Sequence, residues 1–229
     1  YGTTYKRSNQ MNFLFIDGKT ITDELKLILN QDKTIVLILR NSDEHSVMVH
    51  RKFIIDMVDL GITAPVILNR SYNDISNLDF QIKSSIDIGS LYIDGLGDGV
   101  WVDFGSEYGV VNQTVFGILQ ASRMRISKTE YISCPSCGRT LFDLQETTSK
   151  IREVTNHLKG VKIGIMGCIV NGPGEMADAD YGYVGTGNGY ISLYKGQEVV
   201  KRNIPTDGAV EALIGLIKEH GDWIDPVSV

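Results

Sequence analysis

The chain has 229 residues, 42% of them apolar, and its 22 Lys and Arg residues against 28 Asp and Glu residues give a net charge of −6. This composition predicts a folded protein with one large domain or two smaller ones, and it argues against a disordered chain. The acidic balance, without a long basic run, argues against a nucleic-acid-binding protein. No apolar run approaches the roughly 20 residues that a membrane helix needs, so a membrane protein is not expected.

The first half of the chain alternates between predicted strands and predicted helices. Apolar runs typical of strands buried on both faces occur at residues 12–16, 34–39, 64–68 and 99–104. Apolar residues at helical spacing predict helices that begin near Thr20 or Thr22 and near Ser46, and others over residues 84–94 and around residues 111–119. About four parallel βα units therefore precede residue 126, which predicts an α/β fold, either doubly wound or part of a TIM-like barrel.

The pattern changes near Glu130. Short strands are predicted at residues 131–133 and 161–166, and a helix between them follows a capping-box pattern at residues 140–143. Alternating and Gly-rich residues from 181 to 204 predict antiparallel hairpins, and apolar spacing from Ala209 predicts a last helix. We therefore expect an α/β domain over residues 1–128 and a small α+β domain over residues 129–229.

All three cysteines of the chain lie in two short segments. Cys134 and Cys137 form a C-x-x-C pair, and Cys168 lies in a Gly- and Pro-rich loop that ends at Glu175. An odd number of cysteines does not suit a disulfide framework. The pattern instead favours a reducing compartment and a metal site.

The type of metal site stays open on spacing alone. A thioredoxin-type redox pair needs no third cysteine, and structural zinc normally takes four Cys or His ligands. Cys168 could also be a small apolar residue that is buried after a strand. An iron–sulfur cluster is favoured, because Gly167, Gly172 and Gly174 let the backbone pass close to a bulky inorganic core.

The fourth ligand of such a cluster is not a cysteine. Glu175 is the nearest candidate, and an iron held by an exchangeable carboxylate can take a substrate oxygen. A solvated loop acid is the alternative for Glu175. Asn171 can present amide groups beside the cluster or serve only as a turn residue. Arg139 can pair with a phosphate or with a structural carboxylate.

These loops resemble the C-terminal region of the 4-hydroxy-3-methylbut-2-enyl diphosphate synthase family, the iron–sulfur enzymes of the non-mevalonate isoprenoid pathway. The likeness rests on I-S-C-P-S-C-G-R at residues 132–139 and G-C-I-V-N-G-P-G-E at residues 167–175. It continues from M-A-D-A-D at residues 176–180 to His220 and includes D-G-L-G-D-G at residues 94–99. In all, the resemblance covers about residues 84–226.

The resemblance implies a 4Fe-4S cluster held by Cys134, Cys137, Cys168 and Glu175, with Asn171 contacting the substrate. The implied reaction is the reductive ring opening and dehydration of 2-C-methyl-D-erythritol 2,4-cyclodiphosphate, with electrons from ferredoxin or flavodoxin. The cluster domain is implied to resemble half of a sulfite/nitrite reductase domain. A full-length homodimer is implied as well, in the bacterial cytoplasm or, for a plant-type member, in the plastid stroma.

The family also has a TIM barrel that grips the substrate, and this barrel is missing here as a complete unit. Residues 1–83 resemble, more weakly, the barrel-like domain inserted in three-domain members. Because Tyr1 is not an initiator methionine, we expect a processed chain or part of a longer protein, inactive alone. The alternative is a non-enzymatic electron-transfer or zinc-binding scaffold module, whose missing fourth thiolate would come from a partner chain.

Overall fold

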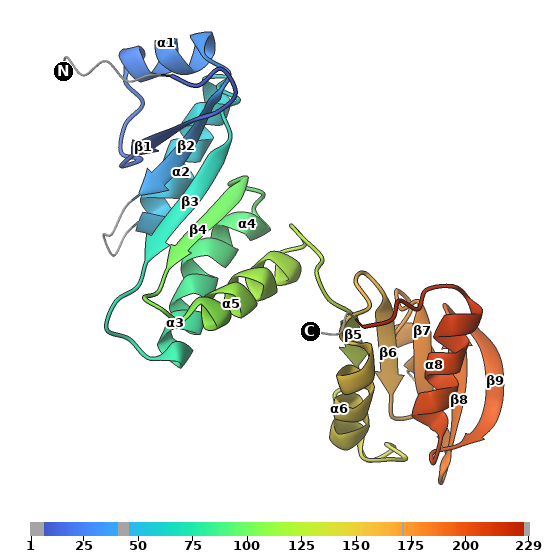
Figure 1. Cartoon of the computed structure of the whole chain (residues 1–229). Coiled ribbons are helices and arrows are strands. Elements are labelled where there is room, and N and C mark those ends of the chain that lie inside the picture. Colours follow the sequence, from blue (N-terminus) through green and yellow to red (C-terminus); the bar gives the residue numbers. More distant parts are fainter. Residues whose placement is uncertain (1–6, 41–45, 171, 227–229) are drawn as a thin grey trace. The chain divides into compact units, whose positions relative to one another are not determined.

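The structure, a computed structural model, describes residues 7–40, 46–170 and 172–226 (Figure 1). The chain divides into two compact units, Tyr1–Arg125 and Ile126–Val229, each with its own apolar core. Both units combine helices with a sheet that contains parallel strands, which confirms the α/β class predicted for the chain. No helix in these described ranges is long and apolar enough to span a membrane.

The sheet of the first unit has parallel strands whose order in space follows their order in the sequence. The strands are β1 (Asn12–Ile16), β2 (Ile35–Arg40), β3 (Val66–Ser71) and β4 (Gly99–Asp103). A doubly wound sheet reverses its strand order at a switch point, whereas a barrel keeps the sequential order. Of the two arrangements that the sequence leaves open, the observed order is therefore the one found in a barrel wall.

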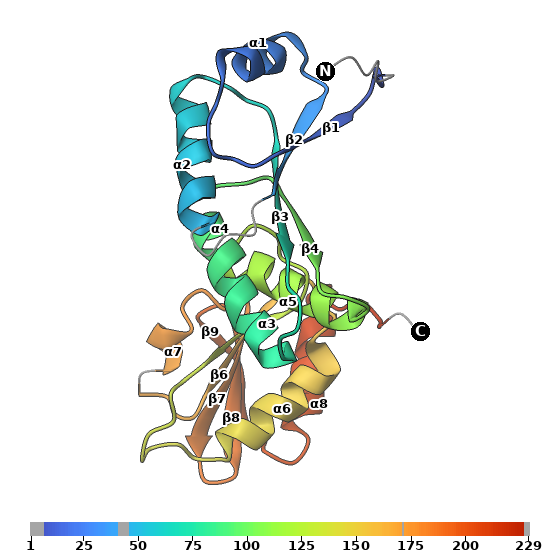
Figure 2. The same ribbon diagram turned by 90° about the vertical axis from the view of Figure 1, so that its left-hand side faces the viewer.

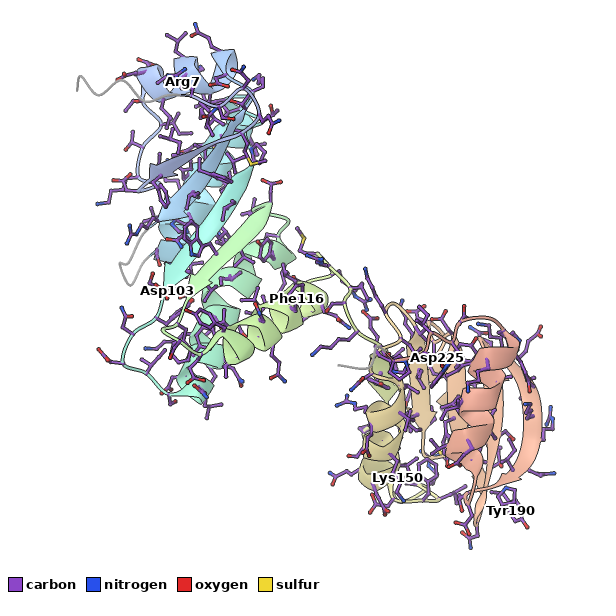
Figure 3. The ribbon with its side chains drawn as sticks, in the orientation of Figure 1. Arg7, Asp103, Phe116, Lys150, Tyr190 and Asp225 are labelled. Carbon is purple, nitrogen blue, oxygen red and sulfur yellow. The ribbon has the colours of Figure 1, made fainter. Side chains whose placement is uncertain are left out.

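Helical segments connect these strands. They are α1 (Asp23–Gln31), α2 (Ser46–Asp59), α3 (Asn77–Ser84), the π-helical turn η1 (Ser85–Gly89), α4 (Ser90–Ile93) and α5 (Tyr108–Ala121). Thr22, one of the two predicted caps, is the N-cap of α1, and its hydroxyl accepts a hydrogen bond from the Leu25 N–H at 3.2 Å. Phe116, labelled in Figure 3, lies on α5. The guanidinium of Arg125, after α5, lies 5.1 Å from the centroid of the Phe116 ring.

The helix predicted over residues 84–94 begins earlier, at Asn77. Ser76 is its N-cap and accepts a hydrogen bond from the Asp79 N–H at 3.1 Å. The sequence assigns residues 71–79 to a polar connection, and this assignment is wrong from Asn77 onward. Because Ser and Asp favour both loops and helix N-termini, the start of the helix is hidden in a polar run.

Most of the apolar core of this unit lies on one face of the sheet. On that face Leu14, Leu37 and Leu68 pack into a core with residues of α1, α2, α4 and α5, and α2 runs along it (Figure 2). On the opposite face Ile38 of β2 is only 1% exposed, whereas Phe13 of β1 and Trp101 of β4 are 55% and 49% exposed. The predicted burial on both faces is therefore confirmed for β2 and wrong for β1 and β4.

The sheet of the second unit is mixed. Its strands, in spatial order, are β5 (Glu130–Ser133), β6 (Lys162–Met166), β7 (Tyr181–Gly187), β8 (Tyr190–Lys195) and β9 (Glu198–Pro205). The first three are parallel, and the last two join by antiparallel pairing, which confirms the predicted hairpins. Gly189 and Gly196, both with positive φ, form the two hairpin turns.

Three helices belong to the described part of this unit: α6 (Leu144–Thr155), α7 (Gly172–Glu175) and α8 (Ala209–Glu219). α6 and α8 pack on one face of the sheet (Figure 1). The predicted capping box at residues 140–143 is wrong, because the N-cap of α6 is Asp143, whose carboxylate accepts the Glu146 N–H at 2.9 Å. Thr140 belongs instead to the loop that carries the cysteines.

Candidate metal centre

The two cysteine loops leave the same edge of the second sheet. β5 ends at Ser133, β6 ends at Met166, and the two strands are parallel neighbours. Their carboxyl ends therefore lie side by side, at the edge where α/β proteins place their functional loops. Cys134 directly follows β5, and Cys168 follows β6 after a single glycine.

A cavity of about 90 Å³ lies between these loops. It is lined by Cys134, Pro135, Ser136, Cys137, Arg139, Thr140, Cys168, Gly172 and Glu175. The structure therefore brings Cys134, Cys137, Cys168 and Glu175 to one place, although they come from segments far apart in the sequence. Asn171, the other candidate of the sequence analysis, lies outside the described residues.

Backbone hydrogen bonds tie the two loops to each other. The Gly167 N–H donates to the Sγ of Cys134 at 3.3 Å, and the Leu141 N–H donates to the Gly167 carbonyl at 3.1 Å. Within the first loop, the Cys137 N–H donates to the Thr140 hydroxyl at 3.2 Å. These hydrogen bonds fix the Cys134 sulfur and the backbone of Cys137 relative to the second loop.

Gly167 is required by the close approach of these loops. A Cβ at Gly167 would lie 2.7 Å from the Cγ2 of Thr140. A Cβ at Gly185, on β7, would collide with the Gly167 carbonyl. A side chain at either position therefore requires the surrounding segments to shift, and Gly167 is explained by packing of the protein on itself.

The three thiols differ in exposure and in electrostatic surroundings. None of them forms a disulfide, Cys137 is exposed, and Cys134 and Cys168 are half-buried. The backbone N–H of Arg139 and, next, its guanidinium lower the pKa of the Cys137 thiol, while the charge of Glu175 opposes this shift. Cys137 is thus favoured as the thiolate, the form that binds metals.

Arg139 turns toward the cysteines. Its interactions with Cys137 and, next, with the charge of Cys168 raise the pKa of the Arg139 guanidinium. The phosphate or carboxylate partner expected for Arg139 stays a prediction. The cavity therefore carries a permanent positive charge at its rim.

The donor set consists of three thiols and one carboxylate around one cavity. In the described residues no group of three or more His, Cys, Asp or Glu side chains lies close enough to hold one metal ion. The ligands of an iron–sulfur cluster each bind a different iron, so they surround a volume, as the four side chains surround this cavity.

No histidine of the described residues lines the cavity. His157, the histidine closest in sequence to the two loops, follows α6 and shares a hydrogen bond of 2.8 Å with the Ile224 carbonyl. Its ring packs edge-on against Trp223, with ring centroids 5.2 Å apart. His157 is thus engaged elsewhere, which leaves Glu175 as the non-cysteine donor that lines the cavity.

Thr140 and Met176 are two residues that the sequence analysis does not single out. Thr140 fills the space above Gly167, and Met176 packs against strand glycines under α7. The signal that could have found them is the set of glycines inside predicted strands, because such glycines often mark a close approach of another segment.

Comparison with known proteins gives the cysteine loops a family context. Residues 130–219 match the family model described as "GcpE protein C-terminal domain". The chain is 53% identical over 216 residues to 4-hydroxy-3-methylbut-2-en-1-yl diphosphate synthase (flavodoxin) of Parabacteroides distasonis, covering 94% of this chain and 35% of that protein. It is also 49% identical over 209 residues to the chloroplastic 4-hydroxy-3-methylbut-2-en-1-yl diphosphate synthase (ferredoxin) of Arabidopsis thaliana, covering 89% of this chain and 28% of that protein.

The matched length sets the scope of this similarity. The chain spans about a third of the length of the curated relatives it matches, at 35% of the first bacterial relative. The family model covers both cysteine loops and α7, so the similarity includes the whole cavity. Residues 130–219 therefore belong to the GcpE C-terminal domain family, and most of the chain is homologous to one part of the 4-hydroxy-3-methylbut-2-en-1-yl diphosphate synthases.

Proposed function

We propose that the second unit holds a 4Fe-4S cluster through Cys134, Cys137, Cys168 and Glu175. The observation that supports this proposal is the cavity of about 90 Å³ that these four side chains line. In the full-length protein the chain would serve a synthase that reductively opens and dehydrates 2-C-methyl-D-erythritol 2,4-cyclodiphosphate to 4-hydroxy-3-methylbut-2-enyl diphosphate. The names of the relatives support flavodoxin or ferredoxin as electron donor.

Each residue of the cavity has a distinct task in this proposal. Cys134, Cys137 and Cys168 would hold the cluster through their thiolates, and Glu175 would be its exchangeable ligand. When bound, the cluster supplies single electrons and an iron with an exchangeable position. Arg139 would offset the negative charge of the ligands, and we assign substrate binding to the amide of Asn171, which lies outside the described residues.

The proposal extends to the organisation of the whole protein. Residues 1–128 form the C-terminal part of a barrel-like inserted domain, which the sequential strand order of the first unit supports. Residues 129–229 form the cluster domain, resembling half of a sulfite/nitrite reductase domain. The chain alone is inactive, because the part that grips the diphosphate lies elsewhere in a homodimeric protein. Its compartment is reducing, either the bacterial cytoplasm or the plastid stroma, which three free thiols support.

Anaerobic reconstitution of the chain with iron and sulfide tests the proposal. We expect about four irons and four sulfides per chain and a brown charge-transfer absorption. Glu175→Ala should keep the three thiolate-bound irons and lose the fourth, and in the full-length protein it should abolish activity. Asp178→Ala is the matched control, because Asp178 is an exposed acid near Glu175 that does not line the cavity. Stoichiometric zinc without iron uptake would instead establish the zinc scaffold.

A further inference from the structure

Met176, the residue after Glu175, is seated between two strands. It is 0% exposed. A Cβ at Gly164, on β6, would lie 2.7 Å from the Cβ of Met176, and a Cβ at Gly182, on β7, would lie 2.5 Å from its Sδ. Gly164 and Gly182 are register partners on neighbouring strands. Because neither glycine has a side chain, the space between Gly164 and Gly182 holds the side chain of Met176. This space is here called the methionine seat.

The other end of α7 is fixed in a similar way. A Cβ at Gly172 would lie 2.8 Å from the Cβ of Met166, so Gly172 rests directly on β6. The Met176 N–H donates to the Gly172 carbonyl at 3.0 Å and closes the turn. Four residues of helix are far too few to be stable alone, so the position of α7 depends on these contacts.

The methionine seat lies in a small core of its own. Met176 packs with Met166, Ala179, Val184 and Tyr194, a cluster separate from the main core under α6 and α8. Cys134 contacts both clusters. The same small core therefore supports a thiol on one side of the cavity and the turn that carries Glu175 on the other.

We propose that Met176 is a positioning residue, which fixes the carboxylate of Glu175 at the cavity through the seat formed by Gly164 and Gly182. This inference rests on the proposed function, because it assigns Glu175 to a fourth iron. Cys134 also packs against this small core, but its Sγ accepts a hydrogen bond from the Gly167 N–H, a contact that does not pass through α7. Displacing Met176 should therefore affect Glu175, the residue next to it in the chain, more than the thiols.

This role differs from that of an ordinary core residue in what it predicts. A purely structural Met176 would affect all four irons in proportion to the loss of folded protein. A positioning Met176 affects the fourth iron selectively and converts the cluster to a 3Fe-4S form. Electron paramagnetic resonance distinguishes the two outcomes, because an oxidised 3Fe-4S cluster is paramagnetic and an oxidised 4Fe-4S cluster with two charges is not.

The decisive variant is Gly182→Ala in the complete 229-residue chain, reconstituted anaerobically. Its new methyl group would lie 2.5 and 2.6 Å from the Sδ and Cε of Met176, so the end of this fully buried side chain must shift. We expect iron to fall from about four to about three per chain and a 3Fe-4S resonance to appear. Gly187→Ala is the matched control on β7, because a Cβ there has no neighbour within 4 Å.

A double variant tests the methionine seat by enlarging residue 182 and shortening residue 176. Met176→Val in the Gly182→Ala background removes the Sδ and Cε that collide with the new methyl group, and it should restore four irons. The same Met176→Val change should not rescue Gly164→Ala, because that collision involves the Cβ of Met176, at 2.7 Å. Only packing of Met176 in the methionine seat predicts that Met176→Val restores iron in Gly182→Ala and not in Gly164→Ala.

The outcomes separate this inference from the proposed function. A wild-type chain that takes up no iron overturns both. A wild-type chain with four irons, together with a folded Gly182→Ala chain that keeps all four or loses all four, overturns the role of Met176 alone. If Gly182→Ala does not fold, Met176→Val alone decides: partial loss of the fourth iron supports the role, and retention of four irons overturns it.

Discussion

The two units place their polar and apolar side chains in opposite ways. In the first unit, polar side chains are sealed near the carboxyl ends of the strands: Arg70 is buried and contacts the hydroxyl of Ser46, while apolar Phe13 and Trp101 lie half exposed on the sheet. In the second unit, the main core is closed and the thiols line an open cavity at the strand ends. The parallel strands of the first unit thus present half-exposed apolar side chains, whereas those of the second unit carry thiols at their carboxyl ends.

Glycines in the two units also differ in backbone φ and in how closely neighbouring side chains approach them. Gly61 and Gly95 in the first unit have positive φ and open space around them, so they serve turns. Gly164, Gly167 and Gly182 in the second unit have no positive φ, and a Cβ at each would lie within 3 Å of a neighbouring side chain. Gly164, Gly167 and Gly182 are therefore part of how the site is packed.

The prediction with the largest expected effect tests whether the metal binds in the second unit. Cys168→Ser should remove nearly all iron after reconstitution, because a hydroxyl is a far weaker ligand for iron than a thiolate. Ile169→Ser, next to it and 52% exposed, and Phe15→Ser in the first unit should both keep full iron content. Iron and visible absorption are measured for each variant. Full iron in Cys168→Ser, or iron loss in Phe15→Ser, would contradict this assignment.

The next prediction concerns the pH dependence of stability, which we expect to depend on His50 in the first unit. His50, at 0% exposed, has no described hydrogen-bond partner on either ring nitrogen. Burial and, next, the charge of Arg70 lower its pKa from 6.5 to about 4. Between these values the unfolded chain binds a proton that the folded unit excludes, so stability is full above pH 6.5 and falls as the pH decreases.

The expected loss in the free energy of unfolding is about 3 kcal/mol between pH 7 and pH 4. Urea denaturation, followed by the fluorescence of Trp101 in the first unit, measures it. His50→Gln removes the titrating group, and the decrease in stability over this pH range should shrink by most of that amount. An unchanged pH dependence in His50→Gln would show that other groups cause the acid sensitivity.

A smaller effect is expected on stability, where two Gly→Ala substitutions should have opposite signs. Gly167→Ala forces a methyl group against Thr140 at 2.7 Å and should cost about 2 kcal/mol, with reduced iron uptake. Gly117→Ala, in the interior of α5 with no neighbour within 4 Å, should instead stabilise the first unit by roughly 0.5–1 kcal/mol. Urea denaturation of both variants checks the opposite signs. A neutral Gly167→Ala would mean that the cysteine loops move apart easily.

Local patterns predict much of this fold, while contacts between distant segments remain hidden in the sequence. The apolar runs locate β1 to β4, and the Gly-rich alternation locates the hairpins of β7 to β9. Periodicity does not reveal the exposed face at Phe13, because an apolar run does not show whether a second layer covers it. Nor does it reveal the start of α3 at Asn77, where Ser and Asp suit a loop equally well.

The candidate site shows the same division between local and distant information. Spacing and chemistry alone nominate Cys134, Cys137 and Cys168 as metal ligands. The roles of Thr140 and Met176 depend on which strand each one touches, and only the register of β6 and β7 supplies that information. The interaction of Arg139 with the charge of Cys168 likewise joins segments that are distant in the sequence, and no spacing rule encodes it.

The smallest effect concerns the charge at the cavity. Arg139→Gln removes the guanidinium beside Cys137 and Cys168, so a reduced cluster, which carries one more negative charge, loses a favourable interaction. We expect the equilibrium constant for one-electron reduction to fall by about tenfold, or about 59 mV in midpoint potential. Arg139→Lys should fall less, because the charge stays while the planar hydrogen-bonding fork is lost. Redox titration monitored by visible absorption measures both, and iron content serves as the control. A potential unchanged in Arg139→Gln at full iron content would show that solvent screens this charge, and that Arg139 acts on some other partner of the cavity.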